Sequence, residues 1–214
     1  MKLYNLDHSP YATRVRMQIY KKDLDVSIVP PPVEFRTPAF VERFPLGKIP
    51  ILELDDGSHL SDSWVIMEYL EDVMPAVSLC PQGATGRAQM QLLARYADTC
   101  LGPGGLFPLF ALITSGAGTA GAEQQVAALD EELARLERLL GYLPDFEQRP
   151  LHLGDIALAP HMEYVQMLAP MFGVEQPLQQ YPRVAAWRDW VAADAAVAKG
   201  AGEMQAAVRT FFGG

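Results

Sequence analysis

The sequence predicts an α/β domain followed by an all-α domain. Two observations lead to this division. Residues 1–75 alternate between strand-like and helix-like periodicity, in the order β-α-β-α-β-β-α. Beyond residue 84 the strand signals nearly vanish and helical periodicity dominates. We therefore expect domains at 1–75 and 85–214, joined by a linker at 76–84 that contains Pro81 and Gly83.

The first domain opens with a predicted β-α-β unit. Residues 2–6 and 26–29 have the apolar pattern of short strands. Between them, Ala12, Val15 and Ile19 follow helical spacing. Three consecutive prolines then end the second strand, because proline supplies no N–H donor to a sheet.

The rest of this domain is a short helix, a hairpin and a longer helix. Residues 38–44 are compatible with a short helix. Residues 50–54 and 58–61 flank Asp55-Asp56-Gly57, a tight-turn signal that predicts a hairpin. From Ser63 onward, apolar residues recur at helical spacing and predict a helix to about residue 73.

The second domain is expected to be a bundle of helices. The helix at 123–143 is the clearest, because its apolar residues alternate between spacings of three and four. Gly102-Pro103-Gly104-Gly105 is expected to break the helix before it. The predicted helices are 87–101, 123–143, 155–169, 182–193 and 202–212.

Composition excludes several classes of function. The chain has 214 residues, with 17 Lys+Arg against 26 Asp+Glu, a net charge of −9 that disfavours nucleic acid as a partner. Cys80 and Cys100 cannot form a disulfide scaffold or a four-ligand zinc site, and no two histidines have metal-binding spacing, so no metal is expected. No run approaches about 20 uninterrupted apolar residues, so no membrane association is expected. The chain starts in a strand-like pattern without a signal-peptide region, which predicts a cytoplasmic protein.

One glycine-rich segment matches a known ligand-binding pattern. The segment Gly116-Ala117-Gly118-Thr119-Ala120-Gly121 has the spacing of a dinucleotide-binding turn. That turn requires a strand on either side, whereas a long helix follows here, so we interpret the segment as a loop between helices. We interpret the four histidines as loop or surface residues and both cysteines as small buried apolar residues: His8, His59, His152, His161, Cys80 and Cys100.

Three short segments indicate ligand binding. Ser9-Pro10 fits the start of a helix, where a hydroxyl can cap the helix and also help backbone N–H groups to stabilise an anion. Asp62-Ser63 fits a second helix start; it either caps that helix or holds an amino-acid head group, Asp62 the ammonium and Ser63 the carboxylate. Before the third strand, a cis bond in Ile49-Pro50 would turn the backbone of Ile49 outward toward an extended peptide.

Taken in order, these segments resemble the cytosolic glutathione S-transferases, in particular serine-type, bacterial-like members. The similar motifs are Ser9-Pro10-Tyr11-Ala12-Thr13-Arg14-Val15-Arg16, Pro45-Leu46-Gly47-Lys48-Ile49-Pro50 and Asp62-Ser63-x-x-Ile66-x-x-Tyr69-Leu70. Residues 153–160 and the segment from Tyr181-Pro182 to Trp187 resemble that family's sixth and seventh helices, so the resemblance covers nearly the whole chain. It implies a thioredoxin-like N-terminal domain followed by a C-terminal helical bundle.

The resemblance also implies a binding site for glutathione, which would act as co-substrate without a metal. Ser9 falls where serine-type members activate the glutathione thiol. Ile49, next to Pro50, would pair through its backbone with the cysteinyl part. Asp62 and Ser63 would hold the γ-glutamyl end. Lys48 would reach a glutathione carboxylate.

A small hydrophobic electrophile is the other partner that the resemblance implies. It would lie between the two domains, against Tyr11 and the helices after the linker. Phe107 and Phe110 are candidate wall residues, and plain core packing is their alternative role. The resemblance, together with the apolar length of the two helices beside the linker, also predicts a homodimer.

Three positions depart from the family pattern. The slot that holds C-x-x-C in thioredoxin-like relatives is Ser9-Pro10-Tyr11-Ala12, which counts against disulfide exchange. Tyr11 replaces the cysteine that zeta-type members carry, which puts the isomerisation of maleylacetoacetate in doubt. His152 stands where the family has a Ser or Thr cap, so we expect a weakened capping box there.

The sequence therefore predicts an enzyme, a glutathione S-transferase whose bound thiolate attacks a small electrophile. Two alternatives stay open. One is a non-catalytic interaction protein on the same fold, and the other is a glutathione-dependent lyase, dehalogenase or isomerase. The presence of Lys48, Asp62 and Ser63 favours the enzyme, because a scaffold does not need a clamp for a zwitterion.

Overall fold

The computed structural model describes residues 1–116, 118–119 and 121–213. The chain divides into two compact units, one formed by Met1–Cys80 with Ala195–Gly214 and the other by Pro81–Asp194. It passes from the first unit to the second within the segment 76–84 that we expected as a linker. The expected second domain, 85–214, differs from this division because the last segment of the chain belongs to the first unit.

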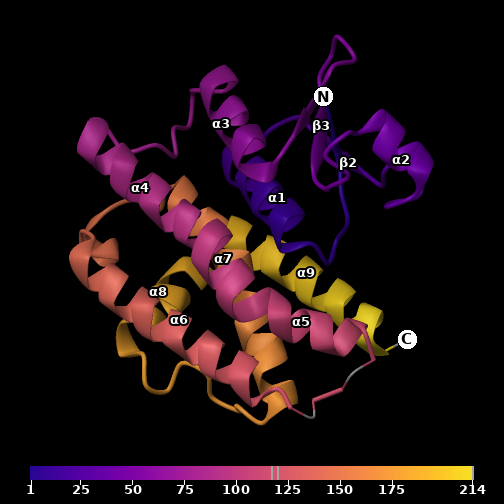
Figure 1. Cartoon of the computed structure of the whole chain (residues 1–214). Helices are drawn as coiled ribbons and strands as arrows, with labels where there is room; N and C mark the ends of the chain where they lie inside the picture. Colours follow the sequence, from indigo (N-terminus) through magenta and orange to yellow (C-terminus); the bar gives the residue numbers. More distant parts are fainter. Residues whose placement is uncertain (117, 120, 214) are drawn as a thin grey trace. The chain divides into compact units, whose positions relative to one another are not determined.

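The first unit contains a four-stranded sheet in the order β2-β1-β3-β4 (Figure 1). Its strands are β1 (Lys2–Tyr4), β2 (Ser27–Val29), β3 (Ile51–Glu53) and β4 (His59–Ser61). Strand β2 runs parallel to β1, whereas β1 with β3 and β3 with β4 are antiparallel pairs. Three helices alternate with the strands: α1 (Pro10–Lys22), α2 (Pro38–Arg43) and α3 (Ser63–Val73). The predicted order β-α-β-α-β-β-α is confirmed.

The two faces of the sheet are covered by different helices. Figure 1 shows α2 on one side of the strands and α1 and α3 on the other. Because side chains alternate along a strand, Leu3 and Tyr4 point to opposite faces. Leu3 is fully buried, and Tyr4 packs with Ile51, Phe40 and Phe44 in a hydrophobic cluster beside α2. Helix α1 is the crossover that the parallel pair β1–β2 requires.

The last helix, α9 (Ala195–Gly213), packs along α1 (Figure 1). A Cβ atom at Gly200 would lie 2.6 Å from Cγ of Met17, so glycine permits this close approach. The sequence predicts only a short helix at 202–212, because Gly200 and Gly202 lower helix propensity. Packing on α1 stabilises a longer helix than propensity alone would form.

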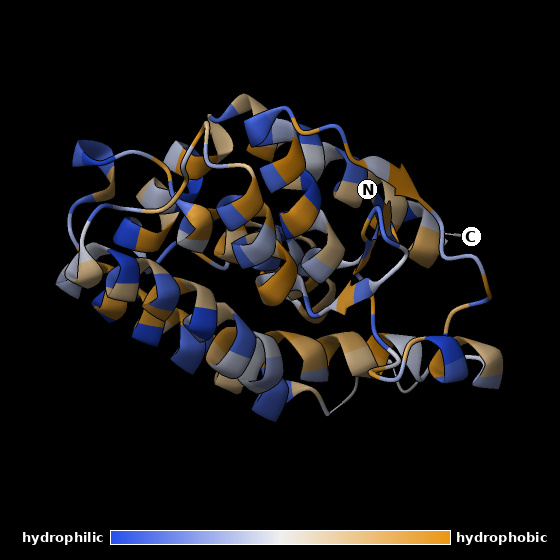
Figure 2. Ribbon diagram, turned by 90° about the horizontal axis from the view of Figure 1, so that it is seen from above, coloured by the Kyte–Doolittle hydropathy of each residue, from blue (hydrophilic) through white to orange (hydrophobic). Residues whose placement is uncertain are grey.

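The second unit is built from helices. They are α4 (Ala84–Tyr96), the π-helix η1 (Ala97–Leu106), α5 (Phe107–Thr114), α6 (Glu123–Tyr142), the 3₁₀-helix η2 (Phe146–Gln148), α7 (Leu153–Leu168), the 3₁₀-helix η3 (Ala169–Phe172) and α8 (Pro182–Ala192). Hydrophobic and hydrophilic residues alternate around the helices, as an amphipathic pattern requires (Figure 2). Helix α7 is the exception, since all its residues from Leu153 to Val165 are buried, and it forms the centre of this unit.

The predicted break at residues 102–105 is wrong. Helices α4, η1 and α5 follow one another without interruption, and the π-helix accommodates Pro103, which lacks an N–H donor. The glycines serve close packing instead. A Cβ atom at Gly102 would lie 2.7 Å from Cε2 of Phe107, and one at Gly105 would lie 3.1 Å from Cα of Leu129 on α6.

This continuous run, Ala84–Thr114, is long and apolar enough by length and composition to cross a membrane. Sequence inspection missed it because its apolar residues are interrupted by polar ones. Within the second unit the run packs against α6 and α7. The core helix of a soluble protein can meet the same criteria of length and composition.

The start of α7 corrects another expectation, because the capping box is fully formed. Nδ1 of His152 accepts the backbone N–H of Asp155 at 3.3 Å, and Oδ2 of Asp155 accepts the backbone N–H of His152 at 3.0 Å. The Asp155 carboxylate also accepts two hydrogen bonds from Arg149, at 2.6 and 2.9 Å, and one from Nε1 of Trp187 at 2.9 Å. Burial opposes ionisation of Asp155, but the hydrogen bonds from Arg149 and His152 outweigh it and hold the pKa of this carboxyl well below its usual value.

Two of the four histidines are buried, and one of them, His161, corrects the interpretation as a loop or surface residue. His152 caps α7, and His161 lies inside the same helix with no exposed surface. Cys80 and Cys100 are half-buried, and burial raises the pKa of the Cys80 thiol. A raised pKa disfavours the thiolate that a nucleophile would need.

The predicted loop at 116–121 includes Ala117 and Ala120, which lie outside the described residues. Its described residues belong to neither a helix nor a strand. The segment before it is helix α5, not the strand that a dinucleotide-binding turn requires.

Candidate functional site

Three loops of the first unit leave the sheet at the same end. Tyr4 at the end of β1 lies opposite Ile51 at the start of β3, and Ile51 lies opposite Ser61 at the end of β4. The loop after β1, the loop before β3 and the turn after β4 therefore start at one edge. These loops and the first residue of α3 contain six of the predicted site residues: Ser9, Lys48, Ile49, Pro50, Asp62 and Ser63.

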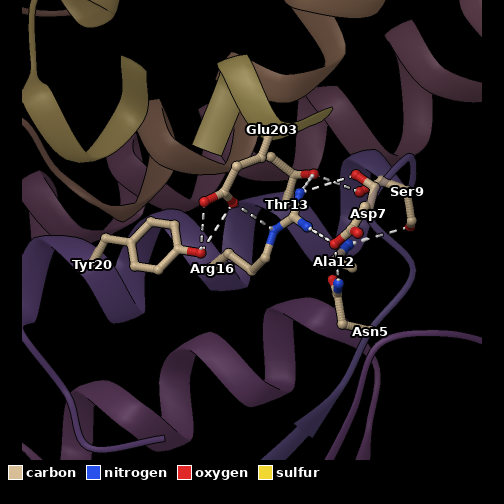
Figure 3. Close-up of polar contacts among 8 residues, drawn as sticks. All are labelled: Asn5, Asp7, Ser9, Ala12, Thr13, Arg16, Tyr20 and Glu203. Carbon is tan, nitrogen blue, oxygen red and sulfur yellow. Dashed lines mark hydrogen bonds and ion pairs between the residues drawn. The ribbon is translucent and has the colours of Figure 1, made fainter. Parts of the chain in front are cut away.

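Ser9 is the N-cap of α1. Its backbone is extended, and its Oγ accepts the backbone N–H of Ala12 at 3.3 Å (Figure 3). Among the described residues the Ser9 hydroxyl acts only as an acceptor, so its hydrogen is available to a ligand. The capping interpretation is confirmed, and it leaves the hydroxyl free to act as a donor at a helix N-terminus.

Before β3, the Ile49–Pro50 peptide bond is cis, which is the condition that sequence analysis set for an outward-facing Ile49 backbone. The Ile49 side chain is buried in the hydrophobic cluster that contains Tyr4 and Ala12, which anchors this loop beside the first turn of α1. Within the described part of the chain, the N–H and C=O groups of Ile49 have no hydrogen-bond partner. The adjacent Lys48 is exposed and forms no ion pair with a described residue.

Asp62 is the N-cap of α3, and it has a positive φ of 78°. Its Oδ1 accepts the backbone N–H groups of Trp64 at 2.9 Å and Val65 at 3.2 Å. Its second carboxylate oxygen makes no hydrogen bond to the described residues, and the side chain is exposed. Asp62 thus combines the capping role with an oxygen that is open to a cation.

Ser63 is buried and held by an arginine. Its Oγ accepts two hydrogen bonds from the Arg14 guanidinium, from Nε at 2.9 Å and from Nη2 at 2.6 Å. Because both bonds use Oγ as acceptor, the hydroxyl hydrogen must point elsewhere. The backbone N–H of Ser63, at the start of α3, also has no partner among the described residues.

Arg14 lies at the candidate site, and sequence analysis assigned it no role. It is 1% exposed, joins α1 to the start of α3 through Ser63, and lies over the Tyr11 ring with Cζ 5.1 Å from the ring centroid. The sequence feature that could have pointed to Arg14 is a charged residue on a helix that buries one face. Arginine is almost never fully buried without partners, so such a residue is expected to bind a nearby polar group. Together with the N-termini of α1 and α3, Arg14 makes this end of the sheet favourable for anions.

The three candidates for the electrophile pocket fall in different units. Tyr11 belongs to α1 of the first unit. Phe107 and Phe110 belong to α5 of the second, where their rings contact His161 and Tyr164 of α7 at centroid distances of 6.1 and 6.0 Å. These contacts are those expected of the core-packing alternative for the two phenylalanines.

Among the described residues, no three His, Cys, Asp or Glu side chains are grouped so that they could hold a metal ion. The groups at this end of the sheet are hydroxyl donors, backbone amides, one carboxylate and two cationic side chains. Such a set can bind a zwitterionic, extended ligand and stabilise an anion beside Ser9.

Comparison with known proteins agrees with this geometry. Residues 3–77 match the model of the glutathione S-transferase N-terminal domain, and residues 119–189 match that of the glutathione S-transferase C-terminal domain. The chain is 30% identical over 204 residues to maleylacetoacetate isomerase of Pseudomonas aeruginosa, covering 90% of this chain and 92% of that protein. It is 27% identical over 204 residues to a probable glutathione S-transferase of Oryza sativa subsp. japonica, covering 88% of this chain and 83% of that protein.

A solved structure has the same fold over nearly its whole length. It is a glutathione S-transferase of Methylobacillus flagellatus with glutathione bound, which is 27% identical to this chain. The TM-score is 0.73, and the match covers 93% of this chain and 98% of that one. With the thioredoxin-like order of the first unit and the helical second unit, these similarities establish that the chain belongs to the glutathione S-transferase family.

Proposed function

We propose that this protein is a glutathione transferase in which the Ser9 hydroxyl stabilises the glutathione thiolate for attack on a small electrophile. The observation that supports this most directly is the Ser9 hydroxyl, which stands at the N-terminus of α1 with an unused hydrogen. The thiolate would be the acceptor for that hydrogen.

The other two loops supply groups for the rest of glutathione. The open carboxylate oxygen of Asp62 suits the ammonium of the γ-glutamyl end, and the Ser63 hydroxyl and N–H suit its carboxylate. The unpaired backbone groups of Ile49 suit the cysteinyl peptide units. Lys48 suits the carboxylate at the other end.

The Ser9 hydrogen bond and the N-terminus of α1 can together supply the free energy needed to lower the pKa of the bound thiol. A free thiol with a pKa of about 8.5 is about 3% ionised at pH 7, and lowering its pKa by about 2 units makes it roughly three-quarters ionised. This shift corresponds to about 2.7 kcal/mol. A hydrogen bond to a charged group contributes about 1.5–3 kcal/mol and a helix N-terminus about 0.3–1 kcal/mol.

The deciding experiment is the ultraviolet absorbance of enzyme-bound thiolate as a function of pH, for the wild type and Ser9→Ala. We expect Ser9→Ala to raise the midpoint and to lower kcat/KM by roughly 10- to 150-fold, the loss of about 1.5–3 kcal/mol. Thr37→Ala is a matched control, because Thr37 caps α2 with the same 3.3 Å bond to a backbone N–H and lies outside the three loops. It should cost stability and leave the midpoint unchanged.

An unchanged midpoint in Ser9→Ala would make Ser9 a structural cap only. The thiol-activating role would then pass to Tyr11. Tyr4 is a weaker substitute, because its hydroxyl already donates to the Glu53 carboxylate, and burial together with that bond raises its pKa.

A glutathione-dependent isomerase is the second candidate, favoured by the 30% identity to maleylacetoacetate isomerase of Pseudomonas aeruginosa. In such a reaction the thiolate adds to a cis double bond, the new single bond rotates, and elimination returns the thiol and the trans product. Assaying one preparation with a cis-enedione acid and with an activated aryl halide separates the two candidates. Consumption of glutathione with the aryl halide identifies the transferase. Formation of the trans product with glutathione recovered identifies the isomerase. Failure to be retained on a glutathione resin would favour a non-catalytic role instead.

We also propose that the protein is a homodimer. The helices on either side of the linker each expose apolar side chains, Val65 and Val73 on α3 and Leu92 on α4. Light scattering at micromolar concentration should therefore give about twice the chain's mass of 23.6 kDa. A monomer mass would contradict this proposal.

A further inference from the structure

The loop that carries Ser9 is held by a polar network that ends on the last helix (Figure 3). The network contains Asp7 and Ser9 of the loop after β1, Thr13 and Arg16 of α1, and Glu203 of α9. All five residues belong to the first unit. Of these five residues, only Ser9 was predicted to act on the thiol.

Arg16 lies at the centre of this network and is 1% exposed. Its Nη1 donates to Oδ1 of Asp7 at 2.6 Å, and its Nη2 donates to the carbonyl oxygen of Asp7 at 3.0 Å. The guanidinium therefore holds both the side chain and the backbone of the residue two positions before Ser9. Asn5 supports the same carboxylate oxygen through Nδ2 at 2.7 Å.

A second branch reaches Ser9 itself. Nη2 of Arg16 donates to Oγ1 of Thr13 at 2.8 Å, and that hydroxyl donates to the carbonyl oxygen of Ser9 at 2.8 Å. The Ser9 carbonyl also accepts the Thr13 backbone N–H at 2.9 Å, and the Ser9 N–H donates to the Leu6 carbonyl at 2.9 Å. The backbone on both sides of the Ser9 Cα is thus fixed, which limits the directions that its hydroxyl can take.

Helix α9 completes the surroundings of Arg16. Nε of Arg16 is buried without a hydrogen bond, and Oε2 of Glu203 lies 3.7 Å from it. Glu203 is held in turn by the Tyr20 hydroxyl, at 3.0 and 3.2 Å from its two oxygens. Burial, then the hydrogen bond and charge of Glu203, raises the pKa of Tyr20 to about 12, so this hydroxyl remains a donor at neutral pH.

The end of α9 touches the same loop at a second place. The Phe211 ring stacks on the His8 ring, with a centroid distance of 4.9 Å and an interplanar angle of 24°. His8 directly precedes Ser9. The last helix therefore supports the loop from both Glu203 and Phe211.

We propose that Arg16, supported by Glu203 of the last helix, is a positioning residue that aims the Ser9 hydroxyl at the bound thiol. This inference rests on the proposed function of Ser9 and extends it to a helix far from Ser9 in the sequence. Arg16 acts through the loop and through Thr13, and it makes no contact with the thiol. The last helix is thereby part of the machinery of the first unit.

The test is the pH titration of enzyme-bound thiolate in three test variants, one rescue variant and one control. Thr13→Val removes the link between Arg16 and Ser9 at nearly constant volume, Arg16→Lys removes the planar fork, and Glu203→Gln removes the charge that faces Nε. Each should raise the midpoint and lower kcat by roughly 2- to 12-fold, the effect of one hydrogen bond, with the KM for glutathione within about twofold. Thr13→Ser keeps the hydroxyl and should restore the wild-type midpoint. Glu42→Gln is the matched control for charge, because Glu42 is exposed on α2 and has no partner among the described residues.

Making the same three changes in the wild type and in Ser9→Ala separates this inference from the proposed function. In Ser9→Ala, none of the three changes should move the midpoint further, because the residue through which they act is gone. Wild-type midpoints in Thr13→Val and Arg16→Lys, with reduced stability, would overturn the inference and leave Ser9 in its role. A wild-type midpoint in Glu203→Gln alone would overturn the part played by the last helix. If Ser9→Ala itself leaves the midpoint unchanged, the proposed role of Ser9 fails, and this inference fails with it.

Discussion

Helices α1 and α7 both begin with a side chain that accepts the backbone N–H three residues later, at 3.3 Å in each case. At α7 that third residue is Asp155, and its carboxylate accepts four further hydrogen bonds, from the His152 backbone, Arg149 and Trp187. Asp155 has no exposed surface. At α1 the Ser9 hydroxyl makes one bond as an acceptor, and its hydrogen has no acceptor in the described chain.

The difference lies in how much hydrogen-bonding capacity each helix start leaves unused. The cap of α7 is saturated and buried, so its bonds contribute to stability and leave nothing for a ligand. The caps of α1 and α3 are partly unsaturated and accessible, so the same kind of residue can bind a substrate without giving up its structural role. Substitutions should therefore affect stability at α7 and catalysis or binding at α1 and α3.

The largest effect should come from Asp155→Ala. Removing this carboxylate leaves the half-buried Arg149 and the Trp187 N–H without their partner, and breaking a buried ion pair costs about 3–5 kcal/mol. The free energy of unfolding in urea measures the loss. Asp145→Ala is the control, since Asp145 is an exposed acidic cap of η2 and its loss should cost about 0.5–2 kcal/mol. Equal losses in the two variants would mean that the network around Asp155 adds nothing to an ordinary cap.

At α3 we expect binding to change more than stability. Asp62→Ala should raise the KM for glutathione by roughly 10- to 100-fold with a smaller effect on kcat, because a carboxylate–ammonium contact is the same in the ground and transition states. Asp62→Asn separates the two roles of this residue, since its amide oxygen can still accept the N–H groups of Trp64 and Val65 but has no charge. It should keep the stability of the wild type and have the raised KM of the alanine variant. A KM within twofold of wild type in both variants would remove Asp62 from the site.

A pH series sharpens the comparison at α7. The pKa of Asp155 is lowered in the folded protein, so the stability it contributes is present above about pH 4 and is lost as the pH falls toward its folded pKa. The difference in unfolding free energy between the wild type and Asp155→Asn should be constant from about pH 7 to pH 5 and should shrink below about pH 4. The slope from one group is at most about 1.4 kcal/mol per pH unit. The same comparison, with and without Asp155→Asn, in a His152→Ser background excludes any contribution of the imidazole to the difference in unfolding free energy. A difference that stays constant down to pH 3 would contradict the assignment of the pH dependence to Asp155.

The smallest effect should come from His152→Ser. Serine supplies an acceptor for the Asp155 N–H in place of Nδ1, so the unfolding free energy should change by less than about 0.5 kcal/mol. His152→Ala, which removes the acceptor, should cost about 0.5–2 kcal/mol. If the serine variant is as unstable as the alanine variant, the imidazole contributes more to this helix start than its capping bond.

Local patterns were enough to predict the order of strands and helices in residues 1–75. Periods of two and 3.6 residues, the turn at Asp55-Asp56-Gly57 and the Ser9-Pro10 start signal depend on neighbours in sequence, so they can be recognised without a structure. The candidate site followed in the same way, because Ser9 and Asp62 are strong capping types at predicted helix starts. Family resemblance supplied their ligand.

Contacts between distant segments decided the rest. Glycine and proline at 102–105 have the local signal of a break, but close packing against Leu129 and π-helical geometry keep the helix continuous. Gly200 lowers propensity within α9, yet its missing side chain lets the helix approach Met17 and join the first unit. The contacts of Arg14 with Ser63 and of Arg16 with Asp7 and Glu203 likewise cannot be predicted from local sequence patterns. The sequence by itself determined the order of strands and helices in residues 1–75 and the helix starts at Ser9-Pro10 and Asp62-Ser63, because those preferences are local. Only the tertiary structure decided which buried charges are paired and which helix ends keep a free donor, because both depend on segments that folding alone brings together.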